Sequence, residues 1–434
     1  MPQIEKIQEH DIYSRTGNVL CYLCFAGAAF SIAVDSFTAI AFSLFFIVAV
    51  VARRSKTPNI IYKYGIALVL VFVLVSLSFS GEFTNNIPLL KKFWRILLPF
   101  GIFIALSLNE NLLFRCLNIM LVFLVLNTFI GIVQRHTGFD LTYLQPILLE
   151  EDKGFNSTGT FSHHLTYAGV MLLTFPVYLS LIFSEHISGK AKKFYLAGAV
   201  ILFIAMIYSL SRSALLASAI SIFMLLLLNK KIKILMIASV FVVILASGLF
   251  LIKKYSPETI ASTESFGRLT NISPQFGDDR FYMWEAAWGV INEHFLFGQG
   301  ADITPLENEY ERIETRNSEE RQRSWKFNNQ ARVGVHNIYL QLWLDYGFFV
   351  LLSYLLMWAG IAFTAIVAIR RKNSATMKDT HILTGIIAAL LGFFFMGLFE
   401  NNFYDGELNH IVMMWIGVSA YIVEKIRQHK KTRL

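Results

Sequence analysis

Charged residues and cysteines are scarce in this sequence. Only 16% of the 434 residues are charged, whereas 55% are hydrophobic. A soluble domain of this length would not contain so many long apolar runs. The cysteines, Cys21, Cys24 and Cys116, all lie within apolar runs, where a cysteine usually acts as a small hydrophobic side chain. No further Cys or His lies close in sequence to Cys21 and Cys24, so their spacing gives little support for a redox or metal site.

The hydrophobic residues form about twelve runs of membrane-spanning length. They lie near residues 18–34, 36–52, 64–80, 93–108, 112–134, 166–184, 194–210, 213–228, 234–252, 338–369, 382–399 and 409–424. We therefore expect an all-α polytopic membrane protein. Residues 1–254 would form an N-terminal helical block, 255–335 a long polar loop, and 336–434 a C-terminal helical block. The loop should contain helices, because Trp284, Trp288 and Ile291 recur with helical spacing.

Positive residues are concentrated in short segments between the apolar runs. With the N-terminus inside, these segments all fall on the cytoplasmic side, together with the basic C-terminus: 53–56, 190–193, 230–233 and 370–372. This distribution follows the positive-inside rule and accounts for the net charge of +8 without a nucleic-acid partner. Residues 255–335, 400–408 and Arg212 then lie on the outer side. Lys91, Lys92, Lys253 and Lys254 are exceptions, which either are tolerated there or face a negative ligand.

His336, Arg212 and Arg280 are the main candidate site residues on the outer side. His336 precedes an apolar helix and could exchange protons near neutral pH. An arginine at membrane depth usually has an anionic partner, and Arg212 lies near a helix N-terminus, which also favours anions. A base with fixed cations suits displacement of a diphosphate. Structural alternatives remain: a histidine at the membrane interface, an arginine that extends to the interface, and a salt bridge from Arg280 to Asp278 or Asp279.

Other outer residues are secondary candidates. Glu400 and Asp405 could act as a substitute base or as arginine partners. His163 and His164 lie where the chain re-enters the membrane. Asp278 and Asp279 could instead hold a metal, although the Asp-x-Asp arrangement is absent. The segment 297–300, Phe-Gly-Gln-Gly, predicts a tight turn and is only a weak candidate for a phosphate cradle.

These motifs resemble those of bacterial O-antigen ligases. The resemblance rests on Arg212-x-x-x-Leu216 at a helix start and on His336-Asn337 followed nine residues later by Gly347. The segments 280–284 and 298–300 are also similar to the usual loop sequence of this family. The likeness extends over about residues 155–420. Protein O-oligosaccharyltransferases share the His-Asn-x9-Gly pattern, and O-antigen polymerases share it more loosely. Val350 departs from the pattern, since the family often has a small residue there.

The resemblance implies a GT-C-like glycosyltransferase of the bacterial inner membrane, with both termini cytoplasmic and the active site facing the periplasm. It would transfer an O-antigen glycan from undecaprenyl diphosphate to a sugar hydroxyl of lipid A-core, with inversion and without a metal or other cofactor. His336 would be the general base, and Arg212 and Arg280 would neutralise the diphosphate. The further candidates for binding the diphosphate or the glycan are Asn337, His163, His164, Lys253, Lys254, Tyr282 and Glu400. The alternatives are an O-antigen polymerase, a protein O-oligosaccharyltransferase and a transporter of a lipid or amphipathic anion.

Overall fold

The computed structural model describes residues 2–52, 60–81, 83–140, 145–146, 157–234, 274–316, 334–371 and 376–431. Almost all of these residues lie in helices. The exception to the helical pattern is a short antiparallel pair, β1 (Phe139–Asp140) with β2 (Gln145–Pro146), in which Phe139 is opposite Pro146. The expected all-α architecture is therefore confirmed for the described part of the chain.

Apolar helices form a bundle. Among the described residues, 7 helices are long and apolar enough to cross a membrane. They are α2 (Ile32–Val51), α3 (Ile60–Phe79), α6 (Leu112–Thr137), α7 (His164–Leu181), α8 (Gly189–Tyr208), α17 (Phe348–Arg370) and α18 (Met377–Met396). The bundle also includes α1 (Pro2–Phe30), α5 (Leu98–Leu108), the shorter apolar α9 (Arg212–Leu228) and α19 (Gly406–Lys431). These helices make the chain a multi-pass membrane protein. The predicted run at 234–252 lies outside the described residues, apart from its first residue.

The centre of the bundle is formed by α7 and α18. In both helices 83% of the apolar stretch is buried, compared with 33% in α2, α3 and α8. Close packing depends on small residues, as is common between membrane helices. A Cβ at Gly392 would lie 2.0 Å from Ser221 Oγ on α9, and one at Gly385 would lie 2.5 Å from Val177 Cα on α7. The peripheral helices instead expose large apolar side chains, as lipid contact requires: Phe37, Leu44, Val71, Phe129 and Phe363.

The structure divides the predicted run at 338–369 into two helices. The first is α16 (Ile338–Tyr346), and the second is α17, which begins after Gly347. Gly347 has φ +80° and ψ 179°, a conformation that is almost restricted to glycine. A Cβ there would lie 2.1 Å from the Leu296 carbonyl oxygen. The break therefore results from the close approach of the chain that follows α13.

Short helical turns connect α3 to α5. They are η1 (Phe83–Asn86), α4 (Ile87–Leu90) and η2 (Lys91–Leu97). The predicted run at 93–108 therefore begins as a 3-10 helix before it becomes α5. These turns lie at the same end of the bundle as the long loop, because the Asn86 side chain accepts a hydrogen bond from the Ala301 backbone N–H.

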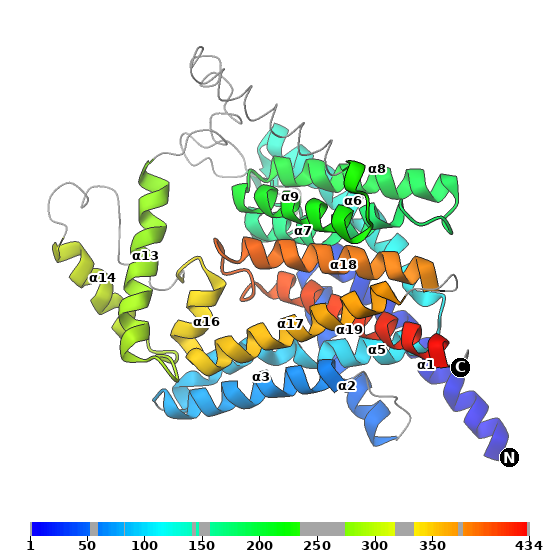
Figure 1. The fold of residues 1–434 in the computed structure, drawn as a ribbon, viewed down its shortest axis with the longest axis horizontal. Coiled ribbons are helices and arrows are strands. Elements are labelled where there is room, and N and C mark those ends of the chain that lie inside the picture. Colours follow the sequence, from blue (N-terminus) through cyan, green and yellow to red (C-terminus); the bar gives the residue numbers. More distant parts are fainter. Residues whose placement is uncertain are drawn as a thin grey trace, which may run out of the picture.

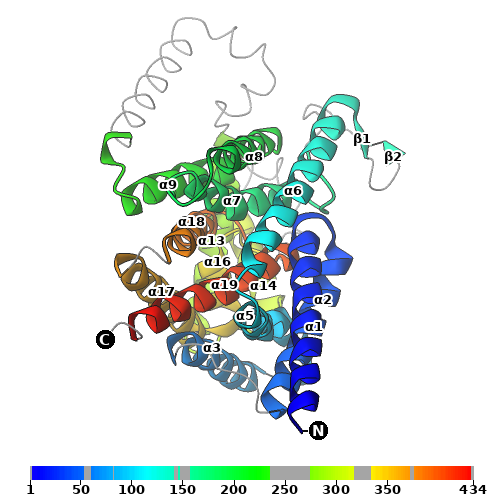
Figure 2. The same cartoon turned by 90° about the vertical axis from the view of Figure 1, so that its right-hand side faces the viewer.

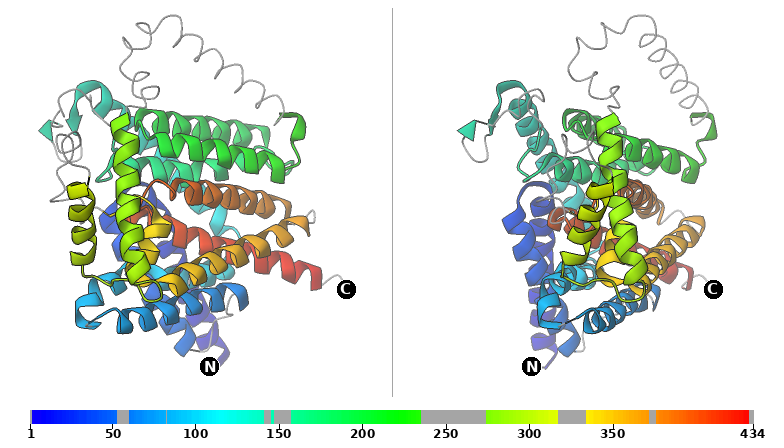
Figure 3. Two further views of the ribbon diagram at one scale, coloured as in Figure 1. Left: turned by 60° about the vertical axis from the view of Figure 1, so that its left-hand side comes forward. Right: turned by 90° about the vertical axis from the view of Figure 1, so that its left-hand side faces the viewer.

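The long loop contains α13 (Pro274–Glu293) and α14 (Thr304–Arg316). The helix expected around Trp284, Trp288 and Ile291 is thus present. A separate hydrophobic core joins α13, α14 and α16, and its buried side chains are Met283, Ala286, Ala287, Val290, Ile291, Leu306, Tyr310, Ile313, Val335 and Leu344. Figure 1 shows α13 and α14 at one end of the bundle and both chain termini at the other, and Figures 2 and 3 show the same arrangement from the sides. We call the end with α13 the loop end.

Candidate active site

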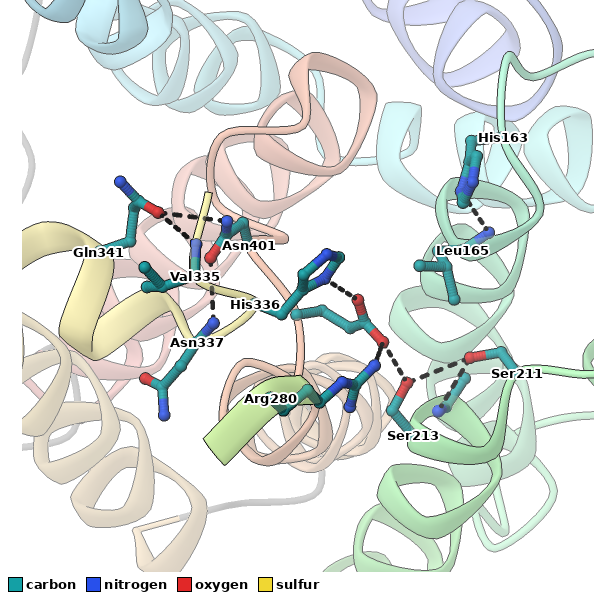
Figure 4. A network of polar contacts seen from close by, with 12 residues as sticks. His163, Leu165, Ser211, Ser213, Arg280, Val335, His336, Asn337, Gln341 and Asn401 are labelled. Atoms are coloured by element: carbon teal, nitrogen blue, oxygen red, sulfur yellow. Dashed lines mark hydrogen bonds and ion pairs between the residues drawn. The ribbon is translucent and has the colours of Figure 1, made fainter. Parts of the chain in front are cut away.

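Glu400 is the centre of a polar network at the loop end. It lies in the α18–α19 loop, residues 397–405, and only 5% of the residue is exposed. Its Oε2 is 3.3 Å from His336 Nδ1, and its Oε1 is 3.1 Å from an Arg280 guanidinium nitrogen. Ser213 donates a further hydrogen bond to Oε1 at 3.1 Å. Figure 4 shows His336, Arg280 and Ser213 around this carboxylate, which comes from a different element than each of them.

His336 is held in an uncommon backbone conformation. Its φ is +48°, in the left-handed region that costs a non-glycine residue about 1–2 kcal/mol. Hydrogen bonds fix the backbone on both sides. The Val335 N–H donates to Gln341 Oε1 at 2.9 Å, the Val335 carbonyl accepts from Trp284 Nε1 at 3.0 Å, and the Asn337 N–H donates to Asn401 Oδ1 at 3.1 Å. These contacts orient the imidazole toward Glu400.

The helix α16 explains the spacing in the His-Asn-x9-Gly pattern. Asn337 is its N-cap: the side-chain oxygen accepts hydrogen bonds from the N–H groups of Tyr339 at 3.0 Å and Leu340 at 3.1 Å. Gly347 terminates the same helix. The nine residues between Asn337 and Gly347 are therefore the helix itself. Asn337, which the sequence indicates only as a candidate for ligand binding, has a structural role as the cap of this helix.

The two candidate arginines occupy different positions. Arg280 pairs with Glu400, and its side chain is 35% exposed. The proposed alternative partners of Arg280, Asp278 and Asp279, have side chains outside the described residues. Arg212 is the first residue of α9 and is half-buried. Its neighbour Ser213, rather than Arg212, makes the contact to Glu400, since successive side chains of a helix point in different directions.

His163 lies beside the network and caps α7. Its Nδ1 accepts a hydrogen bond from the Leu165 N–H at 3.2 Å. Burial lowers the pKa of His163, whereas the nearby Glu400 and Asp405 carboxylates act in the opposite direction. An imidazole that accepts at Nδ1 is neutral, in agreement with the lowered pKa. The His164 ring lies against it, with centroids 4.3 Å apart.

The remaining secondary candidates are Tyr282, Lys253 and Lys254. Tyr282 packs against the core between α13 and α14. Lys253 and Lys254 lie outside the described residues. Lys92 reaches the α18–α19 loop, where its ammonium is 5.2 Å from the centroid of the Tyr404 ring. No group of three or more His, Cys, Asp or Glu side chains with the geometry to hold a metal ion is found among the described residues.

The turn at 297–300 forms as predicted, but its backbone is not a phosphate cradle. The N–H of Gln299 donates to the Leu344 carbonyl at 2.7 Å, and the N–H of Gly300 donates to the Asp345 carbonyl at 3.2 Å. These groups are therefore already used to fasten the end of α13 to α16. Gly298 has φ +71°, and a Cβ there would lie 2.6 Å from the Asp345 carbonyl carbon, which explains the glycine.

The sequence did not indicate the residues that support His336. Gln341 Oε1 accepts from both the Val335 N–H and Asn401 Nδ2, and Gln341 Nε2 donates to Asp345 at 3.0 Å. Tyr404 donates to the same carboxyl group at 2.5 Å. The polar run 400–405 between two apolar runs was the available signal, and it drew attention to Glu400 and Asp405 alone.

The α18–α19 loop also joins the N-terminal ends of several helices. Glu400 contacts Ser213 in the first turn of α9, and Asn401 contacts Asn337 at the cap of α16. Asp405 accepts a hydrogen bond from Thr166 in the first turn of α7 and caps α19 through the Glu407 N–H at 3.1 Å. Each helix N-terminus carries a partial positive charge of about half an elementary charge. The N-termini of these helices therefore converge near His336 and Arg280, where the Glu400 and Asp405 carboxylates face their partial positive charges.

A second buried cluster lies away from this network. Cys24 Sγ is 3.2 Å from His410 Nε2, which also lies 3.1 Å from Asp35 Oδ1. Cys24 thus has a histidine partner that is distant in sequence, which the spacing of the cysteines could not reveal.

Comparison with known proteins links part of the chain to one family. No curated protein matches the chain. The family model described as O-Antigen ligase matches residues 197–355, a narrower range than the likeness noted over about 155–420. The matched range extends from α8 into α17 and includes Arg212, Arg280 and His336, whereas Glu400 lies beyond it. This match and the apolar helical bundle support membership of the chain in the O-antigen ligase superfamily.

Proposed function

We propose that this protein is an O-antigen ligase. It transfers a glycan from undecaprenyl diphosphate to a sugar hydroxyl of lipid A-core at the periplasmic face of the inner membrane. The family match supports a membrane enzyme of the glycosyl-transfer type. The observation that carries the finer proposal is the position of His336, joined through Glu400 to Arg280, at the end of the helical bundle where helix N-termini meet.

His336 acts as the general base in this proposal. A hydrogen bond from Nδ1–H to ionised Glu400 at 3.3 Å places the lone pair on Nε2. The ring nitrogen that is not bonded to Glu400 points away from the carboxylate (Figure 4). Nε2 then takes the proton of the acceptor hydroxyl while the hydroxyl oxygen attacks the anomeric carbon. Glu400 stabilises the imidazolium that results, as a carboxylate does in a carboxylate–histidine pair.

The arginines stabilise the leaving group. As the new glycosidic bond forms, the bond from the anomeric carbon to the diphosphate oxygen breaks, and negative charge grows on undecaprenyl diphosphate. Arg280 uses one guanidinium nitrogen for Glu400 and retains further N–H donors for phosphate oxygens. Arg212 adds a second cation at the start of α9. The helix N-termini of α7, α9, α16 and α19 add backbone dipoles that favour the same charge.

The donor explains why no nucleotide is needed. The diphosphate already activates the anomeric carbon, and direct displacement inverts its configuration. Both substrates carry lipids, so a site at the end of a membrane bundle allows each to remain anchored in the bilayer while the sugars meet at His336. Fixed cations in a partly dehydrated site contribute several kcal/mol to such a transition state, about 3 kcal/mol for one well-placed group.

The cellular phenotype separates the ligase from a polymerase. Cells that lack a ligase make bare lipid A-core and accumulate lipid-linked polymer. Cells that lack a polymerase add a single repeat unit to the core. The experiment is a deletion strain complemented with wild-type protein or with His336→Ala, analysed as a lipopolysaccharide ladder. The proposal predicts bare core with His336→Ala at normal protein level. A core carrying one repeat unit would indicate a polymerase instead.

A further inference from the structure

A cleft at the loop end lies apart from the His336 network. Its volume is about 830 Å³, within the range of ligand-binding pockets. Its walls come from the end of α3 and the following turn on one side, and from the chain between α13 and α14 on the other. Arg280 and Glu293 lie thirteen positions apart in α13, which corresponds to about 20 Å along the helix at 1.5 Å per residue.

The walls of the cleft are fixed by hydrogen bonds. Asn86 donates to the Leu77 carbonyl at 2.9 Å and accepts from the Ala301 N–H at 2.8 Å. Ser76 donates to the Phe297 carbonyl at 2.6 Å. Gly300 has φ +72°, and a Cβ there would lie 2.5 Å from Asn86 Oδ1. The two sides are therefore held together before any ligand arrives, which lowers the entropic cost of binding.

The lining combines hydrogen-bonding groups with aromatic rings. Glu293, Asp302, Asn85 and His294 supply polar groups, and Phe79, Phe295 and Phe297 supply rings. Asp302 accepts a hydrogen bond from the Thr304 N–H at 3.0 Å, which lowers the pKa of its carboxyl group. Carboxylates and amides accept hydrogen bonds from hydroxyls, while rings cover the apolar faces of a ligand.

The side chain of Gln299 has a buried acceptor oxygen without a hydrogen-bond donor in the described part of the chain. It lines the cleft, is 6% exposed, and its Oε1 has no hydrogen-bond partner among the described residues. Its backbone N–H is fixed to the Leu344 carbonyl, so the residue cannot move far. A buried acceptor without a donor costs about 1–3 kcal/mol. The Oε1 atom is itself buried, so a hydroxyl donor in the cleft would remove this cost once the side chain turned toward it.

We propose that this cleft is a second carbohydrate subsite, which binds an uncharged stretch of glycan away from the reacting sugar. The inference rests on the proposed function, because it assigns the cleft to a glycan of the same reaction. The carboxylates of Glu293 and Asp302 repel anionic sugars, so the subsite selects neutral sugars. A glycan held there and near His336 extends along the part of α13 between Arg280 and Glu293. Uncharged sugars are present both in the glycan of the donor and in the oligosaccharide of the acceptor.

The test measures binding without transfer. Full-length protein in detergent is titrated by calorimetry with donor glycan released from its lipid by mild acid and, separately, with delipidated core oligosaccharide. Saturable binding of one of them is expected, and which one binds identifies the source. Oligogalacturonate, an acidic probe, should not compete. Gln299→Met keeps the size of the side chain but removes the acceptor, and Asp302→Asn keeps an oxygen that accepts from the Thr304 N–H but removes the charge. Each should weaken binding at least about fivefold.

The controls separate this subsite from the proposed transfer chemistry. Glu311→Gln changes an acidic residue of α14 outside the cleft and should leave binding unchanged. His336→Ala should abolish transfer and leave glycan binding intact. Absence of saturable binding by both glycans would overturn the subsite, and so would equal weakening by Glu311→Gln and Asp302→Asn. Loss of transfer with His336→Ala is independent of either result and tests the proposed function alone.

Discussion

Substitution of Glu400 by Gln is the sharpest perturbation of the site, because it changes one charge and keeps the shape. Glu400 accepts from Arg280 and Ser213. Its other oxygen is 3.3 Å from His336 Nδ1, which donates to it in the proposed mechanism. A glutamine offers one oxygen and one amide nitrogen. The amide nitrogen must therefore face either the Nδ1–H of His336 or the guanidinium of Arg280, and both of these are donors.

The magnitude follows from the charge that develops on His336 during proton transfer. At about 4 Å and an effective dielectric constant of about 20, a carboxylate stabilises an imidazolium by about 4 kcal/mol. A neutral hydrogen bond recovers part of this energy, so the net loss should be about 2–4 kcal/mol. We therefore expect Glu400→Gln to lower kcat about 30- to 1000-fold, with a smaller effect on KM.

The assay is transfer of glycan to lipid A-core by purified protein, with initial rates measured at several acceptor concentrations. Asp405→Asn is the matched control. It alters a carboxylate in the same loop but retains the side-chain oxygen that caps α19, and its activity should remain close to that of the wild type. A kcat for Glu400→Gln within about threefold of the wild-type value would refute the role assigned to the carboxylate.

Further variants test the supports of the site. Gly347→Ala should prevent recovery of folded protein, because its Cβ would lie 2.1 Å from the Leu296 oxygen; Gly189→Ala, whose Cβ would meet nothing within 4 Å, should fold normally by size-exclusion chromatography. Asn337→Ala should destabilise the protein by about 1 kcal/mol in thermal unfolding, and Asn337→Ser should retain most of the cap. The lowered pKa of His163 means that the folded state binds its proton less readily than the unfolded state. Stability should therefore fall as the pH falls below the ordinary value of 6.5 toward the lowered pKa, and less so in His163→Asn, which caps without titrating. An equal decrease in both proteins would contradict this assignment.

The sequence predicted the helical membrane class well, because long apolar runs have few other solutions in a bilayer. It also predicted His336 and Arg280 as candidates at the same side of the membrane. It named Glu400 only as a possible substitute base or arginine partner. It could not predict that Glu400 contacts both His336 and Arg280, since these residues lie 64 and 120 positions away in sequence. The sequence also did not predict that the apolar run at 338–369 is divided into two helices. Hydropathy does not reveal a left-handed backbone at Gly347, which depends on the chain at Leu296.

The motif residues set the boundaries of a helix as well as supplying candidate site residues, and their spacing alone does not distinguish these two roles. His336-Asn337 and Gly347 begin and end α16, so the pattern records the length of a helix as well as a site. In contrast, Gln341 had no signal in the sequence, and Asn401 was marked only as part of the polar run 400–405. Their importance arises from hydrogen bonds that hold the backbone of His336 in place, and such contacts are visible only after the chain has folded.

The most direct test of the central claim is transfer in vitro in the presence of EDTA. Purified protein is mixed with undecaprenyl-diphosphate-linked glycan and lipid A-core, and the products are separated as a lipopolysaccharide ladder. We predict a ladder that persists in EDTA with the wild-type protein and is absent with His336→Ala. Near-normal transfer by His336→Ala would contradict the assignment of the base. Activity that is lost in EDTA and restored by a divalent ion would contradict the metal-free mechanism and direct attention to Asp278 and Asp279.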